Sequence, residues 1–228
     1  MNLENIKTKT RFLTMKEAVK LIKQNSTIMV GGFGTTGTPE YLLDEIHNSS
    51  YANNLTVISN NINEDSNIYK LFKDKRFIKA IGTYFTTSKN VVNAYRNKEI
   101  EIELVPQGTF VEAIRLGGSG IPAFYTPTSA GTELAKSKET RTFDNKQYVL
   151  EESLTADVAL IKAYKADKSG NLVYRKSARN FNPVMAMAAD LTIVEVDEIV
   201  EVGELDPESI VTPFIFVDVV VDRSENYG

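Results

Sequence analysis

The sequence predicts an α/β fold, in which an open and mostly parallel sheet is connected by crossover helices and carries a small irregular antiparallel lid. Six runs rich in apolar and β-branched residues recur along the chain, and helix-like stretches separate them. Helix-start signals precede several of those stretches, and the alternation is interrupted once, over about residues 117–156. The predicted strands are residues 27–30, 55–58, 77–81, 100–105, 158–163 and 191–196.

Four segments carry side chains that favour a helix start. In two of them a threonine is followed three positions later by a glutamate, the capping-box spacing in which hydroxyl and carboxylate each accept from a free backbone amide. In the other two a threonine or asparagine precedes a proline, which suits the first helical position because proline has no N–H to leave unpaired. The four pairs are Thr14 with Glu17, Thr109 with Glu112, Thr38 with Pro39, and Asn182 with Pro183.

The interruption over about residues 117–156 predicts a lid-like excursion. Residues 117–128 are rich in turn formers, and residues 136–152 indicate polar turns around one short strand. Residues 168–171, Lys-Ser-Gly-Asn, lie between two β-like runs and predict a hairpin turn. No linker is long enough to divide the chain, so we expect a single domain over residues 1–228.

Composition narrows the possible functions. Hydrophobic residues make up 42% and charged residues 25%, values typical of a globular protein. A net charge of −4 gives no attraction to nucleic acid or to an acidic membrane surface. With no cysteine and one histidine, His47, the chain cannot form disulfides, and we expect no metal site. No apolar run approaches the roughly 18 residues that span a bilayer, so we expect a cytoplasmic location and no membrane partner.

A glycine-rich turn at residues 31–37 is the most informative segment. It follows a predicted strand and precedes a predicted helix, and Gly31, Gly32, Gly34 and Gly37 permit unusual backbone dihedrals and close approach to a ligand. Unpaired amides at the start of the helix would add partial positive charge. The turn is therefore a candidate site for a phosphate or a developing oxyanion.

The same glycines match the GxGxxG fingerprint of dinucleotide-binding proteins, and this alternative fails on its second requirement. An acidic residue should follow the next strand to bind a ribose, but Ser59, Asn60 and Asn61 stand there instead. A nicotinamide cofactor is therefore disfavoured. A structural turn that binds nothing remains an alternative.

Beyond these patterns, the segment from Val30 to Pro39 resembles the first signature of class I CoA-transferases, in which three apolar residues precede Gly-Gly-Phe, followed by three variable residues, glycine, any residue and proline. The family usually has Asp or Asn where Gln24 stands. Further blocks match the family in order along nearly the whole chain: residues 106–109 with Glu112 and Arg115, 117–124, 126–128 with 131–132, 156–160, 170–172, 178–183, 203–207 and 211–213. The chain resembles the alpha subunit of such an enzyme.

The resemblance implies exchange of CoA between an acyl-CoA and a free short-chain carboxylate. In the family the thioester is attacked by a glutamate of the beta subunit, which then carries CoA as a glutamyl thioester. Coenzyme A would then be substrate and product, with no tightly bound cofactor. The expected partner is a beta subunit, in an alpha2beta2 assembly. The preferred acyl group cannot be deduced from this chain, since the absent subunit builds part of that pocket.

The resemblance also assigns candidate site residues. It makes residues 31–37, including Phe33, Thr35 and Thr36, the CoA-binding loop. It places a polar active-site residue at Gln107, which could steer the glutamate or the substrate carboxylate. Asn60 and Asn61 follow a strand at the sheet edge where open α/β folds bind ligands, so they could support an oxyanion or form a simple turn.

Other conspicuous residues carry weaker hypotheses. Arg115 and Arg179 could contact a CoA phosphate or the partner, with structural ion pairs as the preferred interpretation. We expect His47 to have no catalytic part. The tail Ser-Glu-Asn-Tyr-Gly at residues 224–228 resembles the beta-subunit nucleophile motif, but a tyrosine interrupts it and we interpret Glu225 as accidental.

Two alternative classes share the fold by analogy: a phosphate- or nucleotide-binding module and a sugar-phosphate isomerase-like protein. An isomerase would need its own titrating acid and base, and no such motif is present.

Overall fold

The computed structural model describes residues 10–224, which form a large sheet, flanking helices and a second, smaller sheet. The large sheet has nine strands in the order β1-β12-β11-β9-β2-β3-β4-β5, with β10 paired to β9. Every pairing is parallel except β9 with β10. Its strands are β1 (Arg11–Phe12), β2 (Thr27–Val30), β3 (Leu55–Ser59), β4 (Phe77–Gly82), β5 (Glu101–Leu104), β9 (Ala156–Asp167), β10 (Leu172–Val173), β11 (Ala189–Val200) and β12 (Val219–Asp222).

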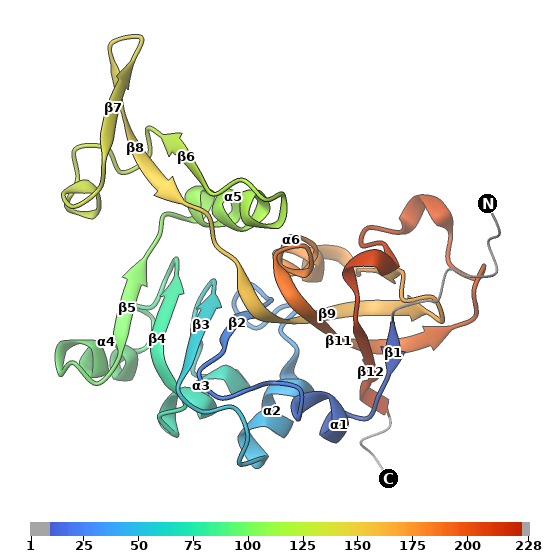
Figure 1. Ribbon diagram of the computed structural model, residues 1–228. Coiled ribbons are helices and arrows are strands. Elements are labelled where there is room, and N and C mark those ends of the chain that lie inside the picture. The colour runs from blue at the N-terminus through green and yellow to red at the C-terminus, as the bar shows by residue number, and fades with distance from the viewer. Residues whose placement is uncertain (1–9, 225–228) are drawn as a thin grey trace.

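The predicted α/β sheet is confirmed, and each of the six predicted strands lies in it. Helices cover both of its faces (Figure 1). Alternate strand residues point to opposite faces: Ile28 and Val30 join one apolar core, whereas Met29 between them joins the other. The helices α1 to α4 pack on the first core and α5 and α6 on the second. They are α1 (Met15–Val19), α2 (Glu40–Asn48), α3 (Asn67–Lys73), α4 (Lys89–Arg96), α5 (Gln107–Gly118) and α6 (Asn182–Ala186).

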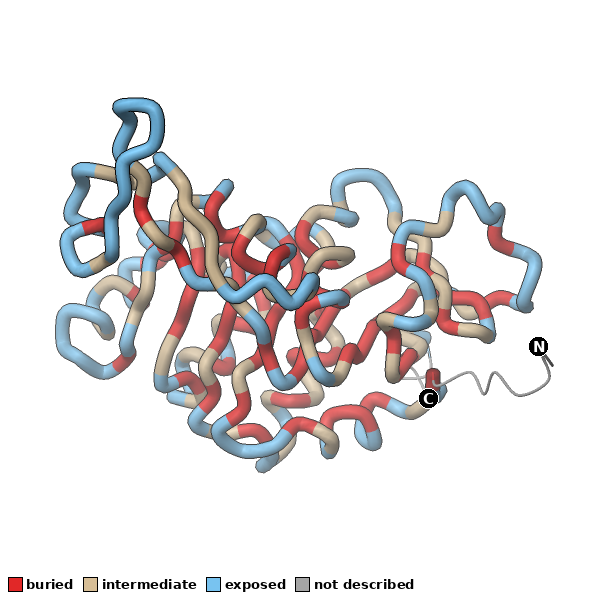
Figure 2. Tube along the Cα trace, turned by 45° about the horizontal axis from the view of Figure 1, so that its top comes forward, coloured by how far each residue is buried: buried red, intermediate tan, exposed pale blue. Residues whose placement is uncertain are grey.

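The interrupted segment forms a three-stranded antiparallel sheet that projects beyond α5 (Figure 1). Its strands are β6 (Ala123–Thr126), β7 (Thr140–Phe143) and β8 (Lys146–Glu152), and the outer hairpin is exposed (Figure 2). The sequence indicated one short strand in residues 136–152, and this was wrong. Asp144 and Asn145 both adopt positive φ, which allows the chain to turn back and form a second strand.

Helix capping follows the prediction at only one of the four starts. Thr14 and Glu17 form the predicted capping box at α1. The prediction that Thr109 caps a helix is wrong, because α5 begins two residues earlier and Thr109 is a buried residue within it. Thr38 makes no capping hydrogen bond, since Pro39 is the N-cap of α2. Asn182 is the first residue of α6, and its side chain bonds elsewhere.

The predicted turn at residues 168–171 and the glycine at position 117 each have a local explanation. The predicted hairpin turn at residues 168–171 is confirmed, with the Asp167 carboxylate accepting from the amides of Ser169 and Asn171. A Cβ on Gly117 would lie 2.3 Å from the carbonyl oxygen of Leu154. That glycine therefore allows α5 to pack closely against the backbone at Leu154.

Within residues 10–224, no helix is both long and apolar enough to cross a bilayer.

Candidate active site

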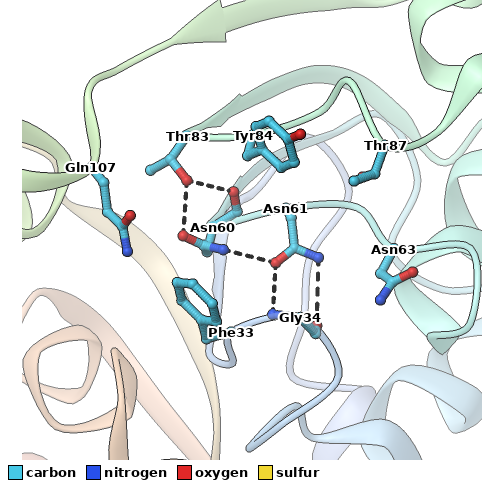
Figure 3. Close-up of a pocket in the computed structure, with 9 residues that line it drawn as sticks. All are labelled: Phe33, Gly34, Asn60, Asn61, Asn63, Thr83, Tyr84, Thr87 and Gln107. Carbon is cyan, nitrogen blue, oxygen red and sulfur yellow. Dashed lines mark hydrogen bonds between the residues drawn. The ribbon is translucent and has the colours of Figure 1, made fainter.

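Four neighbouring parallel strands end at the same edge of the sheet, and the loops that follow them enclose a pocket of about 380 Å³ (Figure 3). The glycine turn follows β2, Asn60 follows β3, Thr83 follows β4, and Gln107 opens α5 after β5. This edge is where open α/β sheets bind ligands. The lining residues are Phe33, Gly34, Asn60, Asn61, Asn63, Thr83, Tyr84, Thr87 and Gln107.

Asn60 and Asn61 join the loops into one hydrogen-bonded network. The Asn60 amide nitrogen donates to Oδ1 of Asn61 at 2.8 Å, and that same oxygen accepts from the amide of Gly34 at 3.0 Å. Thr83 donates from its hydroxyl to Oδ1 of Asn60 at 2.8 Å. The pair therefore lines the pocket and also connects the glycine turn to β3 and β4.

The remaining wall combines an amide with an aromatic ring. The Gln107 side chain extends toward the pocket from the first residue of α5 (Figure 3). Phe33 is 50% exposed and stacks on Phe181, with ring centroids 6.5 Å apart. Phe181 in turn meets Phe110 edge to face at 5.5 Å. An exposed ring on a rigid aromatic base offers an apolar surface to a ligand.

Most backbone donors of the glycine turn are already paired with other groups of the protein. Phe33 and Thr36 exchange amide–carbonyl bonds across the turn, at 3.0 and 3.1 Å. The amide of Gly31 donates to the carbonyl of Leu160, and those of Gly32 and Gly34 donate to asparagine side chains. The turn is thus a rigid structure in which only Phe33 and Gly34 line the pocket.

The sequence suggested unpaired amides at the start of the following helix, and this was wrong. Glu195 on β11 lies 1% exposed beneath α2, and its Oε2 accepts from the amides of Tyr41 at 2.9 Å and Leu42 at 3.1 Å. A buried carboxylate therefore already occupies the positive end of the α2 dipole. Any anion at this site must be bound by the turn and its neighbours.

The electrostatic character of the pocket is neutral. Amides, hydroxyls and aromatic rings line it, and no Asp, Glu, Lys, Arg or His is among its lining residues. It can donate and accept hydrogen bonds, but it supplies no carboxylate nucleophile. Within residues 10–224, no group of three or more potential ligands is placed to hold a metal ion.

The family of the chain follows from comparison with known proteins. A family model described as coenzyme A transferase matches residues 12–223. The chain belongs to the coenzyme A transferase family. This assignment confirms the resemblance carried by the segment from Val30 to Pro39 and the blocks after it.

Relatives of this coenzyme A transferase chain are named as single subunits of such enzymes. One subunit of a probable succinyl-CoA:3-ketoacid coenzyme A transferase from Bacillus subtilis is 50% identical over 207 residues, covering 90% of this chain and 87% of that protein. The alpha chain of the acetate CoA-transferase of Escherichia coli K12 is 42% identical, with coverage of 96% and 99%.

A solved structure shares the fold. An acyl-CoA transferase from Escherichia coli O157:H7, solved as a thioester complex with CoA, superimposes with a TM-score of 0.84 at 21% identity. The match covers 97% of this chain and 49% of the other, so this coenzyme A transferase chain spans about half the length of that protein.

The candidate site also contains residues that the sequence did not predict. Asn63, Thr83, Tyr84 and Thr87 line the pocket together with the predicted Asn60, Asn61 and Gln107. Thr83 and Tyr84 could have been predicted from the sequence, because they directly follow β4 as Asn60 and Asn61 follow β3. Of residues 31–37, the structure brings Phe33 and Gly34 to the pocket, whereas Gly31, Gly32, Thr35, Thr36 and Gly37 do not line it.

The other conspicuous side chains lie outside the pocket. Arg115 forms the structural ion pair that was preferred for it, with Glu112 at 2.6 Å. Arg179 is exposed and has no ion pair within residues 10–224, so the same interpretation is wrong there. His47 lies in the last turn of α2, with its Nδ1 2.7 Å from the carboxylate of Asp74. Glu225 lies outside the described residues.

Proposed function

We propose that this chain is the alpha subunit of an acyl-CoA:carboxylate CoA-transferase that uses short-chain acyl and 3-oxoacyl groups. The observation that carries the proposal is the neutral pocket, which has polar groups to orient a thioester but no carboxylate to attack it. Some relatives are named as single subunits, and one structural relative is about twice as long as this chain. Both observations support a partner chain that supplies the missing carboxylate nucleophile. The smallest active assembly is one alpha and one beta chain, and we infer an alpha2beta2 complex in the cytoplasm.

In this scheme a glutamate of the partner attacks the thioester carbonyl, and the CoA thiolate leaves to give an acyl anhydride. The thiolate then attacks the glutamyl carbonyl, which releases the first carboxylate and forms a glutamyl-CoA thioester. The acceptor carboxylate reverses both steps, so each bond broken is matched by one formed and no other cofactor is consumed. Coenzyme A is therefore a substrate and product.

The pocket residues have distinct parts in this scheme. Gly34 and Phe33 bind the reacting end of the acyl-CoA, and Phe33 offers an apolar surface for the acyl chain or the pantetheine arm. Gln107 orients a carboxylate by hydrogen bonding, and Asn60 with Asn61 stabilises developing negative charge on the thioester oxygen. An isomerase of the same fold is disfavoured because this pocket lacks an acid and a base to move a proton.

The binding role is tested with Gly34→Val in the assembled enzyme. Gly34 has positive φ and open space where a Cβ would lie, so the added side chain enters the pocket and should raise the KM for acyl-CoA. Gly203→Val is the matched control, since Gly203 also has positive φ and open space but does not line the pocket. Equal KM values for the two variants would overturn the assignment of the turn.

A separate experiment tests whether the nucleophile belongs to the partner chain. The purified chain should exchange no CoA, whereas the mixture with its partner should exchange CoA with ping-pong kinetics. Glu225→Ala should leave the activity of the mixture intact. Exchange by the isolated chain would contradict a nucleophile on the partner.

A further inference from the structure

We propose that Asn180 and Asn182 are positioning residues, which clamp the glycine turn and thereby set where Gly34 meets the acyl-CoA. The inference rests on the proposed role of the turn in substrate binding. Both asparagines lie after β10, at or just before the start of α6, far along the chain from the turn, and neither lines the pocket. They act on the ligand only through the backbone of the turn.

Asn180 holds the turn by both atoms of its amide. Its Oδ1 accepts from the amide of Gly32 at 3.2 Å, and its Nδ2 donates to the carbonyl of Thr36 at 2.9 Å. The backbone of Asn180 has φ 21° and ψ −119°, a conformation that favours glycine. A residue kept in a conformation that glycine would adopt more easily indicates that its side chain is needed there.

Asn182 holds the same turn from the side of the sheet. Its side chain is fully buried, its Nδ2 donates to the carbonyl of Gly37 at 2.9 Å, and its Oδ1 accepts from the amide of Lys162 at 2.9 Å. Lys162 belongs to β9, the strand beside β2. The clamp therefore ties the turn to the central strands of the sheet.

The asparagines also contact two of the glycines closely. A Cβ on Gly31 would lie 1.9 Å from Oδ1 of Asn182, and a Cβ on Gly37 would lie 2.4 Å from the carbonyl oxygen of Ala178 and 2.8 Å from Nδ2 of Asn180. The space that a side chain would need is filled by the clamp at Gly31, and by the clamp together with the Ala178 backbone at Gly37. A Cβ on Gly34, by contrast, would have no atom within 4 Å. Two glycines thus accommodate the asparagines, and Gly34 is left to face the ligand.

The clamp is tested with Asn180→Gly in the assembled enzyme, because glycine keeps the backbone conformation and removes both side-chain bonds to the glycine turn. We expect the KM for acyl-CoA to rise about tenfold, with a smaller change in kcat, since a small displacement of binding groups weakens substrate binding. A purely structural defect would reduce the amount of active enzyme, which lowers the apparent kcat and leaves KM unchanged.

The matched control is Asn54→Gly. Asn54 is an exposed asparagine with φ 57°, and it lies before β3 at the opposite edge of the sheet from the pocket. Its substitution should leave KM and kcat at their wild-type values. If Asn180→Gly does not assemble, Asn180→Asp replaces it, because the second carboxylate oxygen would oppose the carbonyl of Thr36 and displace the turn without removing bulk.

The outcomes separate the clamp from the site itself. A wild-type KM in the substituted Asn180 enzyme, with a raised KM in Gly34→Val, would overturn the clamp alone. Wild-type KM values in both would overturn the clamp together with the proposed binding role of the turn. A raised KM in both, with Asn54→Gly unchanged, is the result that we expect.

Discussion

Glu195 on β11 and Lys162 on β9 form an ion pair inside the fold, with Oε1 and Nζ 3.1 Å apart and the Glu195 side chain 2% exposed. The other oxygen of Glu195 accepts from two amides at the start of α2, and Lys162 also pairs with Asp197. One buried carboxylate thus connects the sheet to the helix that follows the glycine turn.

Removing this carboxylate should destabilise the chain strongly. Glu195→Ala leaves the two amides at the start of α2 without their acceptor and removes one partner of the mostly buried Lys162, which should lower the free energy of unfolding by about 3 kcal/mol. Glu195→Gln keeps an acceptor for the amides and should cost about 1 kcal/mol. Urea denaturation of the purified variants measures both values. An alanine variant that is as stable as the glutamine variant would show that Glu195 does not stabilise the start of α2.

The same residue predicts a pH dependence of stability. Burial raises the pKa of the Glu195 carboxyl above its ordinary value of 4.5, while Lys162 and the two amides act in the opposite direction. Because the folded state then holds this proton more tightly than the unfolded state, Glu195 contributes its stability below 4.5 and loses it as the pH rises through the folded pKa.

Thermal melting of the wild type and Glu195→Gln, from below pH 4.5 upward through the folded-state pKa of Glu195, measures this loss of stability. The stability advantage of the wild type should shrink as the pH rises, since glutamine does not titrate. An advantage that grows with pH would mean that Lys162 and the amides lower the pKa of Glu195 by more than burial raises it.

The two threonines of the predicted capping boxes should respond oppositely to valine. Thr14→Val removes the hydroxyl that caps α1 and should cost about 1 kcal/mol. Thr109 is buried in α5, and its hydroxyl has no hydrogen-bond partner within the described residues. Thr109→Val should therefore stabilise the chain by about 1 kcal/mol. Chemical denaturation distinguishes the two, and equal destabilisation would show that the Thr109 hydroxyl is paired.

Gln107 should matter for activity and little for stability. Its side chain is exposed and lines the pocket, so Gln107→Ala in the assembled enzyme should lower kcat/KM by about tenfold to a hundredfold with an unchanged melting temperature. Gln24→Ala is the control, since Gln24 is an exposed glutamine before β2 at the opposite edge of the sheet. Steady-state kinetics would refute the role if both variants kept wild-type kcat/KM.

The success of the fold prediction has a local cause. The six apolar runs were recognisable because a strand segment buried on both faces, such as residues 158–161 in β9, needs continuous β-branched and apolar residues wherever it lies in the sheet. Caps were less predictable. Thr109 has the spacing of a capping box, but α5 begins at Gln107 with Pro106 as its N-cap, and spacing alone cannot locate a helix start to within two residues.

The candidate site was predicted only in part. Asn60 and Asn61 were found because they follow a strand, and Gln107 because the family resemblance places a polar residue there. Thr83 and Tyr84 follow β4 and were missed, although the rule that found the two asparagines applies to them as well.

The sequence by itself determined the parallel sheet, the glycine turn and the family, because these depend on residues that are neighbours along the chain or on motifs in a fixed order. Only the tertiary structure decided which glycine faces the ligand and what occupies the start of α2. Asn180, Asn182 and Glu195 reach those positions from strands and loops more than a hundred residues away, and such contacts are set by the packing of the sheet.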